Sequence, residues 1–330
     1  LRGMFSIAIW DEIRESFFLA RDPYGIKPLY IGKYNEGYIF SSQVKPILKT
    51  KLIDTNLDYD GIMSFFLFGN IIEPNTCFKN ILNLKSGTYC FISKQHGIKF
   101  HQYVDIKNLF VEHSKNKNLN TNPSNNIKNS ISESIKKHTV SDVPIAVMLS
   151  GGIDSSSIIA HLIDLNKKFI AITVVFEEYQ NTNMDELPFA KEIVEGKKIK
   201  HYIRKVSKKE FLNDLDDIID AMDQPTIDGI NTWYACKAAS EKKIKVLLSG
   251  VGGDELFFGY PSFKEIPRLI NISKVLKKIP LGNFFMNCIG NKLYKKTKNR
   301  KWKYLNSFCS NIYTSFWLKR GILTPSEINE

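Results

Sequence analysis

The sequence predicts an α/β protein in which a mainly-β N-terminal part precedes a doubly wound parallel sheet. Short strands separated by Gly and Pro turns fill roughly the first hundred residues. Farther along, the strands become continuous apolar runs separated by helices, which is the pattern of a parallel sheet covered on both faces. Two of these later strands run directly into glycine-rich loops, at 150–152 and 249–253.

The N-terminal part contains two expected β-hairpins and one helix. Residues 4–10 alternate apolar with smaller side chains and are expected to pair with residues 16–20. A second hairpin joins residues 29–31 to residues 38–41 through an Asn-Glu-Gly turn. A helix is expected at 59–68, between the strands of this mainly-β part.

A polar stretch divides the chain into two expected domains. Residues 107–126 are rich in Asn, Lys and Ser and poor in large apolar residues, as linkers are. We therefore place the first domain at 1–106 and the second at 127–330. At the start of the second domain, isoleucines recur at every fourth position, as on one face of a helix: Ile127, Ile131 and Ile135.

Three apolar runs in the second domain predict strands, at 144–149, 169–176 and 244–248. Helices are expected between them, at 155–165 and 232–243. Parallel strands joined by helices put their carboxyl ends at one edge of the sheet, where ligands bind. The buried side of the first of these helices is expected to carry Ile158, Ile159, Leu162, Ile163 and Leu165.

The 330-residue chain is basic, with a formal net charge of +12 and a sequence pI near 9.2. Such a balance occurs in proteins that bind nucleic acid or anionic membranes. The lysines recur in short groups, such as 205–209 and 295–301, and form no dominant tail. We therefore expect the charge to be spread over solvated faces, with neither nucleic acid nor a membrane as a partner.

The cysteine content favours a reduced, cytoplasmic protein. The five cysteines include no C-x-x-C pair and are odd in number, so neither a disulfide framework nor a zinc knuckle is indicated. No apolar run reaches the roughly 18–20 residues of a membrane span. The six histidines show no metal-ligand spacing and are expected to be structural.

The strongest chemical signal is Leu-Ser-Gly-Gly-Ile-Asp-Ser-Ser at 149–156, between an apolar strand and a helix. Backbone N–H groups and the positive helix end converge there, which suits an anion, and the glycines allow close approach. Ser150, Ser155 and Ser156 can donate hydroxyl hydrogen bonds to phosphate oxygens. Asp154 would repel phosphate on its own, but it fits the loop if it holds Mg²⁺ that bridges to the phosphates.

The second signal is Ser-Gly-Val-Gly-Gly-Asp-Glu-Leu-Phe-Phe-Gly-Tyr at 249–260, which again follows an apolar strand. In a doubly wound sheet, this loop and the loop at 149–156 emerge at the carboxyl ends of neighbouring strands and share one crevice. Asp254 would then complete the Mg²⁺ site begun by Asp154.

These motifs carry a resemblance to a known family. The first loop resembles the signature of the PP-loop ATP pyrophosphatases, which cleave ATP between the α- and β-phosphates, and it lacks the Walker pattern of kinase-like phosphate loops. The second loop, with Met-Asp-Gln-Pro-Thr-Ile-Asp at 222–228, is similar to asparagine synthetases within that group. Residues 1–8 and 20–30 resemble the later half of a class II glutamine amidotransferase domain, which is Ntn-hydrolase-like. The whole chain thus resembles the glutamine-hydrolysing asparagine synthetase family.

The resemblance implies roles for individual residues. Backbone at Leu149 and Val174 would flank the adenine and ribose of ATP, and Ser249 and Gly250 would contact the nucleotide. The implied ATP-binding set is Leu149, Ser150, Gly151, Gly152, Asp154, Ser155, Ser156, Val174, Ser249 and Gly250; the metal set is Asp154 and Asp254; and the catalytic set is Asp154, Asp254 and Glu255.

The resemblance also implies a reaction. ATP would adenylate the side-chain carboxylate of aspartate with release of pyrophosphate, and ammonia from glutamine would displace AMP to give asparagine. Mg²⁺ and loop N–H groups would neutralise the departing pyrophosphate. The expected partners are therefore small molecules, namely ATP, aspartate, and glutamine or ammonia, and a homodimer is left open.

The sequence departs from the family pattern in three places. No catalytic cysteine begins the chain, so we expect it to lack glutaminase activity. Val251 stands between two glycines where asparagine synthetases carry a Glu with an acid–base role, and Glu255 is one candidate to compensate. The later segment with a catalytic Lys is not recognised. Because the chain opens at Leu1 and stops after a helix-start pattern at 324–327, we expect it to be truncated at both ends.

Three other interpretations remain open. An amide or lactam synthetase of the same superfamily, acting on a different carboxylic acid, would be compatible with Val251. A tRNA-modifying PP-loop enzyme would use the positive charge, although the amidotransferase-like front part argues against it. A non-catalytic remnant that serves as a scaffold is the third.

Overall fold

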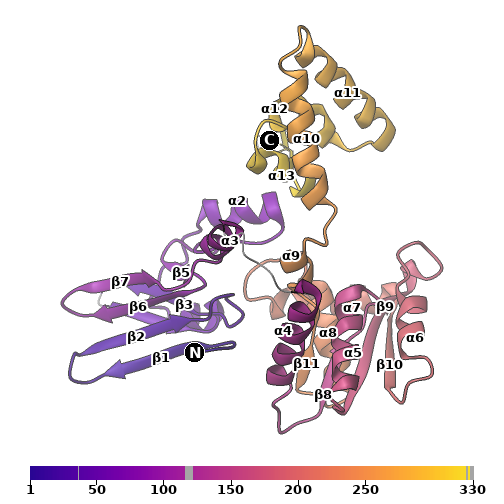
Figure 1. The fold of residues 1–330 in the computed structure, drawn as a ribbon. Coiled ribbons are helices and arrows are strands. Elements are labelled where there is room, and N and C mark those ends of the chain that lie inside the picture. Colours follow the sequence, from indigo (N-terminus) through magenta and orange to yellow (C-terminus); the bar gives the residue numbers. More distant parts are fainter. Residues whose placement is uncertain (36, 116–121, 325, 328–330) are drawn as a thin grey trace. The chain divides into compact units, whose positions relative to one another are not determined.

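The computed structural model describes residues 1–35, 37–115, 122–324 and 326–327, and Figure 1 shows the ribbon. The chain forms two compact units, neither of which is continuous in sequence. The first unit comprises Leu1–Leu119, Met222–Ile227 and Arg320–Glu330, and the second comprises Asn120–Ala221 and Asp228–Lys319. This division is not the sequential one expected at 106 and 127, and the domain boundaries themselves stay a prediction.

Two antiparallel sheets form most of the first unit. The larger contains β1 (Ser6–Asp11), β2 (Ser16–Arg21), β6 (Thr88–Ser93) and β7 (Gly97–Gln102), in that order. The smaller has β3 (Tyr30–Tyr34) between β4 (Gly37–Ser41) and β5 (Ile81–Asn83). Both expected hairpins are confirmed, since β1 pairs with β2 and β3 with β4. Glu36, in the turn of the second hairpin, lies outside the described residues.

Apolar side chains pack on both faces of the smaller sheet. Leu19 and Cys90 of the larger sheet are fully buried in a cluster with residues of the smaller one. The other side of the smaller sheet is covered by α1 (Val44–Lys49), through Val44 and Ile47. These two clusters of buried apolar residues, one shared by the two sheets and one under α1, form the core of the first unit.

The Arg-Asp turn after β2 is the most densely bonded part of the first unit. The Arg21 guanidinium is buried and donates hydrogen bonds to Glu73 Oε1 at 2.6 Å and to the Leu84 carbonyl at 2.6 Å. Asp22 is fully buried, and its carboxylate accepts hydrogen bonds from the backbone N–H groups of Tyr24, Ile26 and Lys27. Arg21 is thus buried with its charge paired by the partly exposed Glu73, and the Asp22 carboxylate is satisfied by backbone N–H groups, so these bonds fix the turn.

The segment Met222–Ile227, which contains the Met-Asp-Gln-Pro motif, packs within the first unit, although the residues on either side of it belong to the second. The Asp223 carboxylate accepts hydrogen bonds from the backbone N–H groups of Val44 at 2.7 Å and Lys45 at 3.0 Å. It thereby caps α1, whose own N-cap residue makes no side-chain bond. Gln224 accepts a further bond from the Cys77 N–H at 2.9 Å.

Helices also occur where the sequence predicts one and where it predicts a linker. The expected helix is confirmed as α2 (Tyr59–Phe68), capped by the side chain of Asp58. Residues 107–115, expected to be linker, lie within α3 (Ile106–Lys115), which carries three consecutive apolar residues at 109–111. The polar composition hid this helix because Lys and Asn do not prevent helix formation. Residues 116–121 of the expected linker lie outside the described residues.

The second unit contains a parallel sheet in the order β10-β9-β8-β11. The three expected strands are confirmed as β8 (Ile145–Met148), β9 (Phe169–Phe176) and β11 (Val246–Leu248). The fourth, β10 (Lys200–Val206), was not expected. It lies at the edge of the sheet and contains Lys, His and Arg, so it lacks the apolar run that marks the buried strands.

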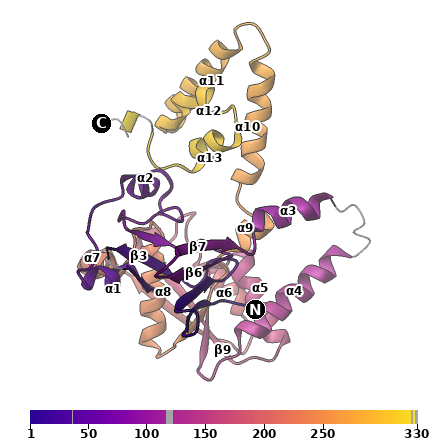
Figure 2. The ribbon, with the colours of Figure 1, turned by 90° about the vertical axis from the view of Figure 1, so that its left-hand side faces the viewer.

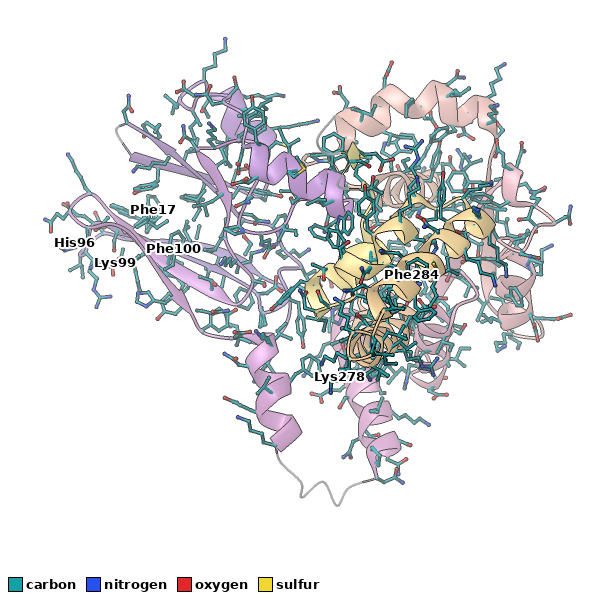
Figure 3. All side chains as sticks on the ribbon, turned by 90° about the horizontal axis from the view of Figure 1, so that it is seen from above. Phe17, His96, Lys99, Phe100, Lys278 and Phe284 are labelled. Carbon is teal, nitrogen blue, oxygen red and sulfur yellow. The ribbon has the colours of Figure 1, made fainter. Side chains whose placement is uncertain are left out.

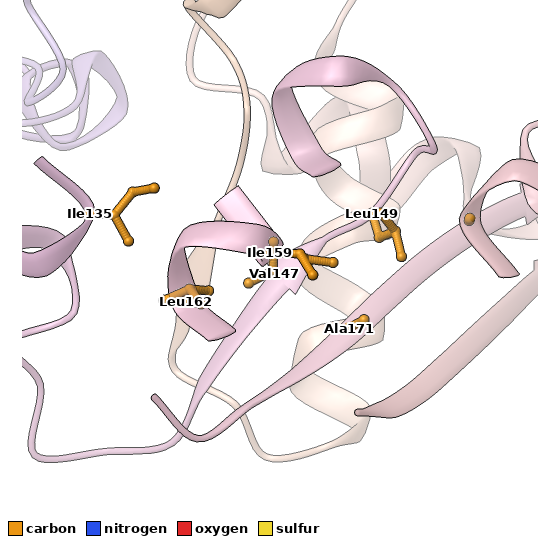
Figure 4. Packing of buried hydrophobic residues seen from close by; sticks show 7 residues of the cluster. Ile135, Val147, Leu149, Ile159, Leu162 and Ala171 are labelled. Carbon is orange, nitrogen blue, oxygen red and sulfur yellow. The ribbon is translucent and has the colours of Figure 1, made fainter. Parts of the chain in front are cut away.

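Helices cover both faces of this sheet, as a doubly wound fold requires. One face packs against α4 (Pro123–His138), α5 (Ile153–Asp164) and α6 (Leu187–Val194). Figure 4 shows Val147 and Ala171 of the strands near Ile159 and Leu162 of α5. The other face packs against α8 (Gly229–Glu241), beside α7 (Lys208–Ala221). Among the residues expected on the buried side of α5, Ile163 is exposed, because it falls between the two faces of the helix.

A helical region follows the sheet. It contains α9 (Gly253–Phe257), α10 (Ser262–Leu276), α11 (Gly282–Thr297), α12 (Leu305–Phe308) and α13 (Ile312–Arg320), with a 3₁₀ turn at Arg300–Tyr304. Another 3₁₀ turn, Glu177–Tyr179, follows β9. Figure 2 shows α10 to α13 gathered together, and Met286, Leu305 and Trp317 are buried among them. Of the helices in the described ranges, none is both long and apolar enough to cross a membrane.

Asp223→Ala should destabilise the first unit, because two helix-capping N–H groups lose a charged acceptor. Such a loss costs about 1–3 kcal/mol. The amide hydrogens of Val44 and Lys45 are expected to exchange with solvent correspondingly faster, measured by hydrogen–deuterium exchange. Asp217→Ala, on an exposed position of α7, is the matched control and should leave these amides unchanged. Equal protection of α1 in both variants would contradict the capping role.

Candidate active site

The first predicted loop joins β8 to α5 at the carboxyl edge of the sheet. Leu149 is buried, and its N–H donates to the Ile172 carbonyl of the neighbouring strand at 2.8 Å. Gly151 has φ +83°, a conformation that glycine adopts at little cost, and a Cβ here would lie 2.6 Å from the Cβ of Phe189. The loop is therefore held against the sheet and α6, and it directs the backbone N–H groups of the α5 N-terminus toward one point.

The serine hydroxyls of the loop bond to one another and to its backbone. Ser156 Oγ donates to the Gly152 carbonyl at 2.6 Å, and Ser155 Oγ donates to the same carbonyl at 3.1 Å. Ser150 Oγ lies 3.2 Å from Ser155 Oγ. A hydroxyl can rotate from an internal partner to a stronger, charged acceptor, so these groups are placed to bind an anion.

The second predicted loop leaves β11, which pairs with β8 in parallel register. Both loops therefore emerge at the same edge of the sheet, as the sequence predicts. Ser249 Oγ accepts from the Val251 N–H at 3.3 Å, and Gly252 has φ +98°. Val251 is 91% exposed at the outermost point of this loop.

The two loops touch at Asp154. A Cβ added to Gly253 would collide with the carboxylate of Asp154, and one added to Gly250 would lie 2.8 Å from the Asp154 Cβ. The backbone N–H of Asp254 also donates a hydrogen bond to the Asp154 carboxylate. Only glycine at 250 and 253 permits this approach, which explains two of the glycines that the motif contains.

The charged groups that act on the Asp154 carboxyl are both acidic. Burial raises the pKa of the Asp154 carboxyl above its ordinary value, and the negative charges of Asp254 and Glu255 raise it further. The backbone N–H of Asp254 opposes this by stabilising the carboxylate. Carboxylates gathered in this way are held together at a cost that a bound cation would remove.

Glycine also makes room for the second aspartate. A Cβ added to Gly259 would collide with Asp254 Oδ1, and the Gly259 N–H donates to the Asp254 carbonyl at 2.9 Å. Tyr260 Oη donates to Glu255 Oε1 at 2.8 Å. The Gly-Tyr pair that closes the second motif thus orients both acidic side chains.

The remaining predicted residue, Val174, lies on β9 two positions past the partner of Met148. It packs with the cluster on the α8 side of the sheet and is half-buried. The predicted site residues therefore fall on β9, in the loops that follow β8 and β11, or in the first turns of the helices α5 and α9 after those loops.

The described residues contain no group of three or more His, Cys, Asp or Glu side chains placed to hold a metal. Mg²⁺ does not require such a cage, since it is commonly held by one or two carboxylates together with water and phosphate oxygens. The interacting carboxylates of Asp154 and Asp254 fit that donor set.

Sequence reasoning missed one supporting pair. Thr173 is buried on β9, and its hydroxyl donates to the Leu149 carbonyl at 2.7 Å. His201 of β10 lies with Nε2 2.8 Å from the same hydroxyl, and burial lowers the pKa of this histidine. His201 is structural, as expected, and it reaches the first loop only through Thr173. Neither residue has a sequence signal, because their spacing depends on the strand register.

The sheet and its paired glycine loops define a doubly wound α/β protein with two glycine-rich loops in contact at the carboxyl edge of its strands. A sequence profile of asparagine synthase matches residues 126–325, and one of a glutamine amidotransferase domain matches residues 1–104. The chain therefore belongs to the asparagine synthase family, which confirms the resemblance found in its motifs.

Curated relatives agree with this assignment. Asparagine synthetase (glutamine-hydrolyzing) 1 of Bacillus subtilis is 31% identical over 284 residues, covering 86% of this chain and 43% of the relative. Asparagine synthetase (glutamine-hydrolyzing) 3 of the same organism is 29% identical, over 80% of this chain and 44% of the relative. Amidase chry2 of Gibberella zeae is 25% identical, over 80% and 41%. The chain thus spans less than half the length of these relatives.

Asp254→Asn should lower the pKa of the Asp154 carboxyl. The substitution removes a neighbouring negative charge but keeps the backbone N–H that bonds to Asp154, so ionisation of Asp154 becomes easier. The carboxyl ¹³C chemical shift of Asp154, followed against pH, measures this. Asp217→Asn on α7 is the control. An Asp154 titration unchanged by Asp254→Asn would mean that the two carboxyls do not interact.

Proposed function

We propose that this protein is an ATP-dependent amide ligase, which activates the side-chain carboxylate of aspartate as an acyl-adenylate and aminates it with glutamine-derived ammonia. The observation that carries the proposal is the contact between Asp154 of the first loop and the backbone of the second. Membership of the asparagine synthase family supports it. ATP, aspartate, and glutamine or ammonia are the proposed substrates, and the cytoplasm is the proposed location.

The first loop is proposed to hold the phosphates of ATP. Leu149 and Val174 flank the adenine and ribose, while Gly151 and Gly152 let the backbone approach the phosphates. The N-terminus of α5 and the serine hydroxyls donate to the oxygens that become pyrophosphate. These donors stabilise the charge that develops as the α–β phosphate bond breaks, which is how such an arrangement lowers a barrier. The hydroxyl donors are Ser150, Ser155 and Ser156.

Asp154 and Asp254 are the residues proposed to hold Mg²⁺. The ion would supply Lewis-acid stabilisation of the phosphate oxygens. The two carboxylates repel each other in the chain as it stands, and a cation between them relieves that repulsion. Nucleotide and metal should therefore bind together rather than independently.

The second loop is proposed to present the acceptor side of the reaction. Ser249 and Gly250 contact the nucleotide, and Glu255, oriented by Tyr260, is the candidate to serve as an acid or base in place of the residue at 251. Val251 itself cannot titrate.

The first unit supports the proposal that glutamine is the nitrogen donor. Residues 1–104 match a glutamine amidotransferase domain, and the curated relatives are named glutamine-hydrolyzing. The domain limits of 1–106 and 127–330 are part of the same proposal.

A second function has one specific observation in its favour. Val251 is almost fully exposed at the tip of the second loop, so no packing demand explains the apolar residue. A ligase of the same superfamily that acts on a different carboxylic acid would account for a changed residue on the acceptor side. ATP–pyrophosphate exchange in the presence of single carboxylic acids separates the two: exchange dependent on aspartate supports the main proposal, and exchange with another acid alone supports the second.

Asp154→Asn should weaken Mg²⁺-dependent ATP binding by at least about tenfold, because the metal loses a charged ligand. Asp254→Asn should do the same, and the double variant should lose little more than either single one, since both residues act through one ion. Titration calorimetry with and without Mg²⁺ measures this. Fully additive losses would place the aspartates in separate sites.

Gly253→Ala should impair the same binding without touching a charged group. The new Cβ displaces the Asp154 carboxylate, and strain of this kind costs about 1–3 kcal/mol. Gly37→Ala is the matched control, because a Cβ there meets its nearest atom at 3.5 Å. Unchanged Mg·ATP affinity in Gly253→Ala would contradict the requirement for contact between the loops.

A further inference from the structure

The positive charge of the chain is concentrated in one segment. Residues 266–326 contain 13 lysines and arginines and no aspartate or glutamate. Because the whole chain has a formal net charge of +12, the rest of it carries a net charge of −1. The expectation of charge on solvated faces did not identify this acid-free segment. The lysines looked scattered because their groups are separated by apolar residues, whereas the acidic residues all lie elsewhere.

Apolar side chains are exposed along the hairpin of α10 and α11, residues 262–297, which begins four residues before this segment and which we call the basic hairpin. On α11, the side packed against other helices carries Gly282, Met286 and Gly290. A second apolar side faces outward, with Leu281 73% exposed and Phe284 62% exposed. The large exposed apolar residues of the basic hairpin are Phe263, Ile272, Val275, Ile279, Leu281, Phe284, Phe285 and Ile289.

Three exposed lysines lie among these apolar residues in the sequence. Lys274, Lys277 and Lys278 are exposed at the end of α10 and in the connection to α11, and Figure 3 shows Lys278 and Phe284. Each lysine can lay its aliphatic stem along the apolar surface while its ammonium group stays at a polar boundary. The basic hairpin is thus apolar at its turn and cationic around it.

We propose that the basic hairpin binds an anionic lipid surface. Apolar side chains at the turn enter the boundary between headgroups and acyl chains, and the lysines contact the anionic headgroups. Charge complementarity is the main argument, because residues 266–326 contain no acidic residue and the one acidic residue of the hairpin, Glu265, is paired with Lys319. The chain would lie on the surface and not cross it, in keeping with the lack of a membrane-spanning helix among the described residues. The proposal replaces the expectation that no membrane is a partner.

Two other occupants fit the surface less well. A second copy of the chain would bring two strongly basic hairpins together, and the like charges would oppose the association. Nucleic acid would satisfy the lysines, but its phosphates would leave the aliphatic and phenylalanine side chains facing a hydrated, charged backbone. A lipid interface offers both an apolar and an anionic layer, so it alone matches both features of the hairpin.

Vesicle co-sedimentation of the whole chain tests the proposal. Binding is expected to vesicles of phosphatidylcholine with about 30% phosphatidylserine, weakly to phosphatidylcholine alone, and to fall as salt rises. The double substitution Lys277→Gln with Lys278→Gln should lower the partition coefficient about 30-fold, since each lysine near such a surface contributes roughly fivefold. Phe284→Ser should lower it as well, by removing an inserted side chain. All of these positions are exposed, so folding is expected to be retained, and circular dichroism checks it.

Matched controls distinguish vesicle binding by the basic hairpin from a nonspecific effect of the chain's total charge. Lys94→Gln with Lys99→Gln removes the same charge from exposed positions of the first unit, and Ile13→Ser removes an apolar residue that is 98% exposed. Both controls should leave binding within about twofold of the unaltered chain. The proposal is overturned by equal loss in the controls, by equal binding to neutral vesicles, or by no vesicle binding. A steeply salt-dependent tRNA shift or a concentration-dependent dimer, each without vesicle binding, would assign the hairpin to nucleic acid or to a second copy.

Discussion

The carboxylate of Asp154 lies directly against the backbone of a loop almost one hundred residues farther along the chain, and the site depends on that approach. Two glycines make it possible, since any side chain at Gly250 or Gly253 would enter the space that Asp154 occupies. The like charge of Asp254 makes the arrangement costly when nothing is bound. A cation with an attached anion removes that cost, which is why the geometry favours a metal–phosphate ligand.

The sheet supplies the rigidity that this contact needs. Adjacent parallel strands β8 and β11 fix where the two loops start, and buried apolar residues on both faces hold the strands in register. Thr173 adds a side-chain bond from β9 to the end of β8, which limits how far the first loop can move. Packing on both faces of the sheet therefore fixes where the loops begin, and the loops carry the residues proposed to bind ATP and Mg²⁺.

The fold was largely predictable because its strongest signals are local. Continuous apolar runs identified β8, β9 and β11, and the glycine motifs placed the loops after two of them. What sequence could not supply were the features set by register or by distant contacts: the polar edge strand β10, the Thr173–His201 support, and the docking of Asp223 on α1. The charge distribution was misjudged for a related reason, since the absence of acidic residues is harder to notice than the presence of lysines.

The central claim is that the two loops form one nucleotide site around a shared metal. A crystal structure with Mg²⁺ and α,β-methylene-ATP, an analogue that resists cleavage at the proposed bond, tests it directly. Phosphate density is expected at the α5 N-terminus beside Ser150 and Ser156. The ion is expected to contact both Asp154 and Asp254. Nucleotide bound elsewhere, or an ion contacting neither aspartate, would contradict it.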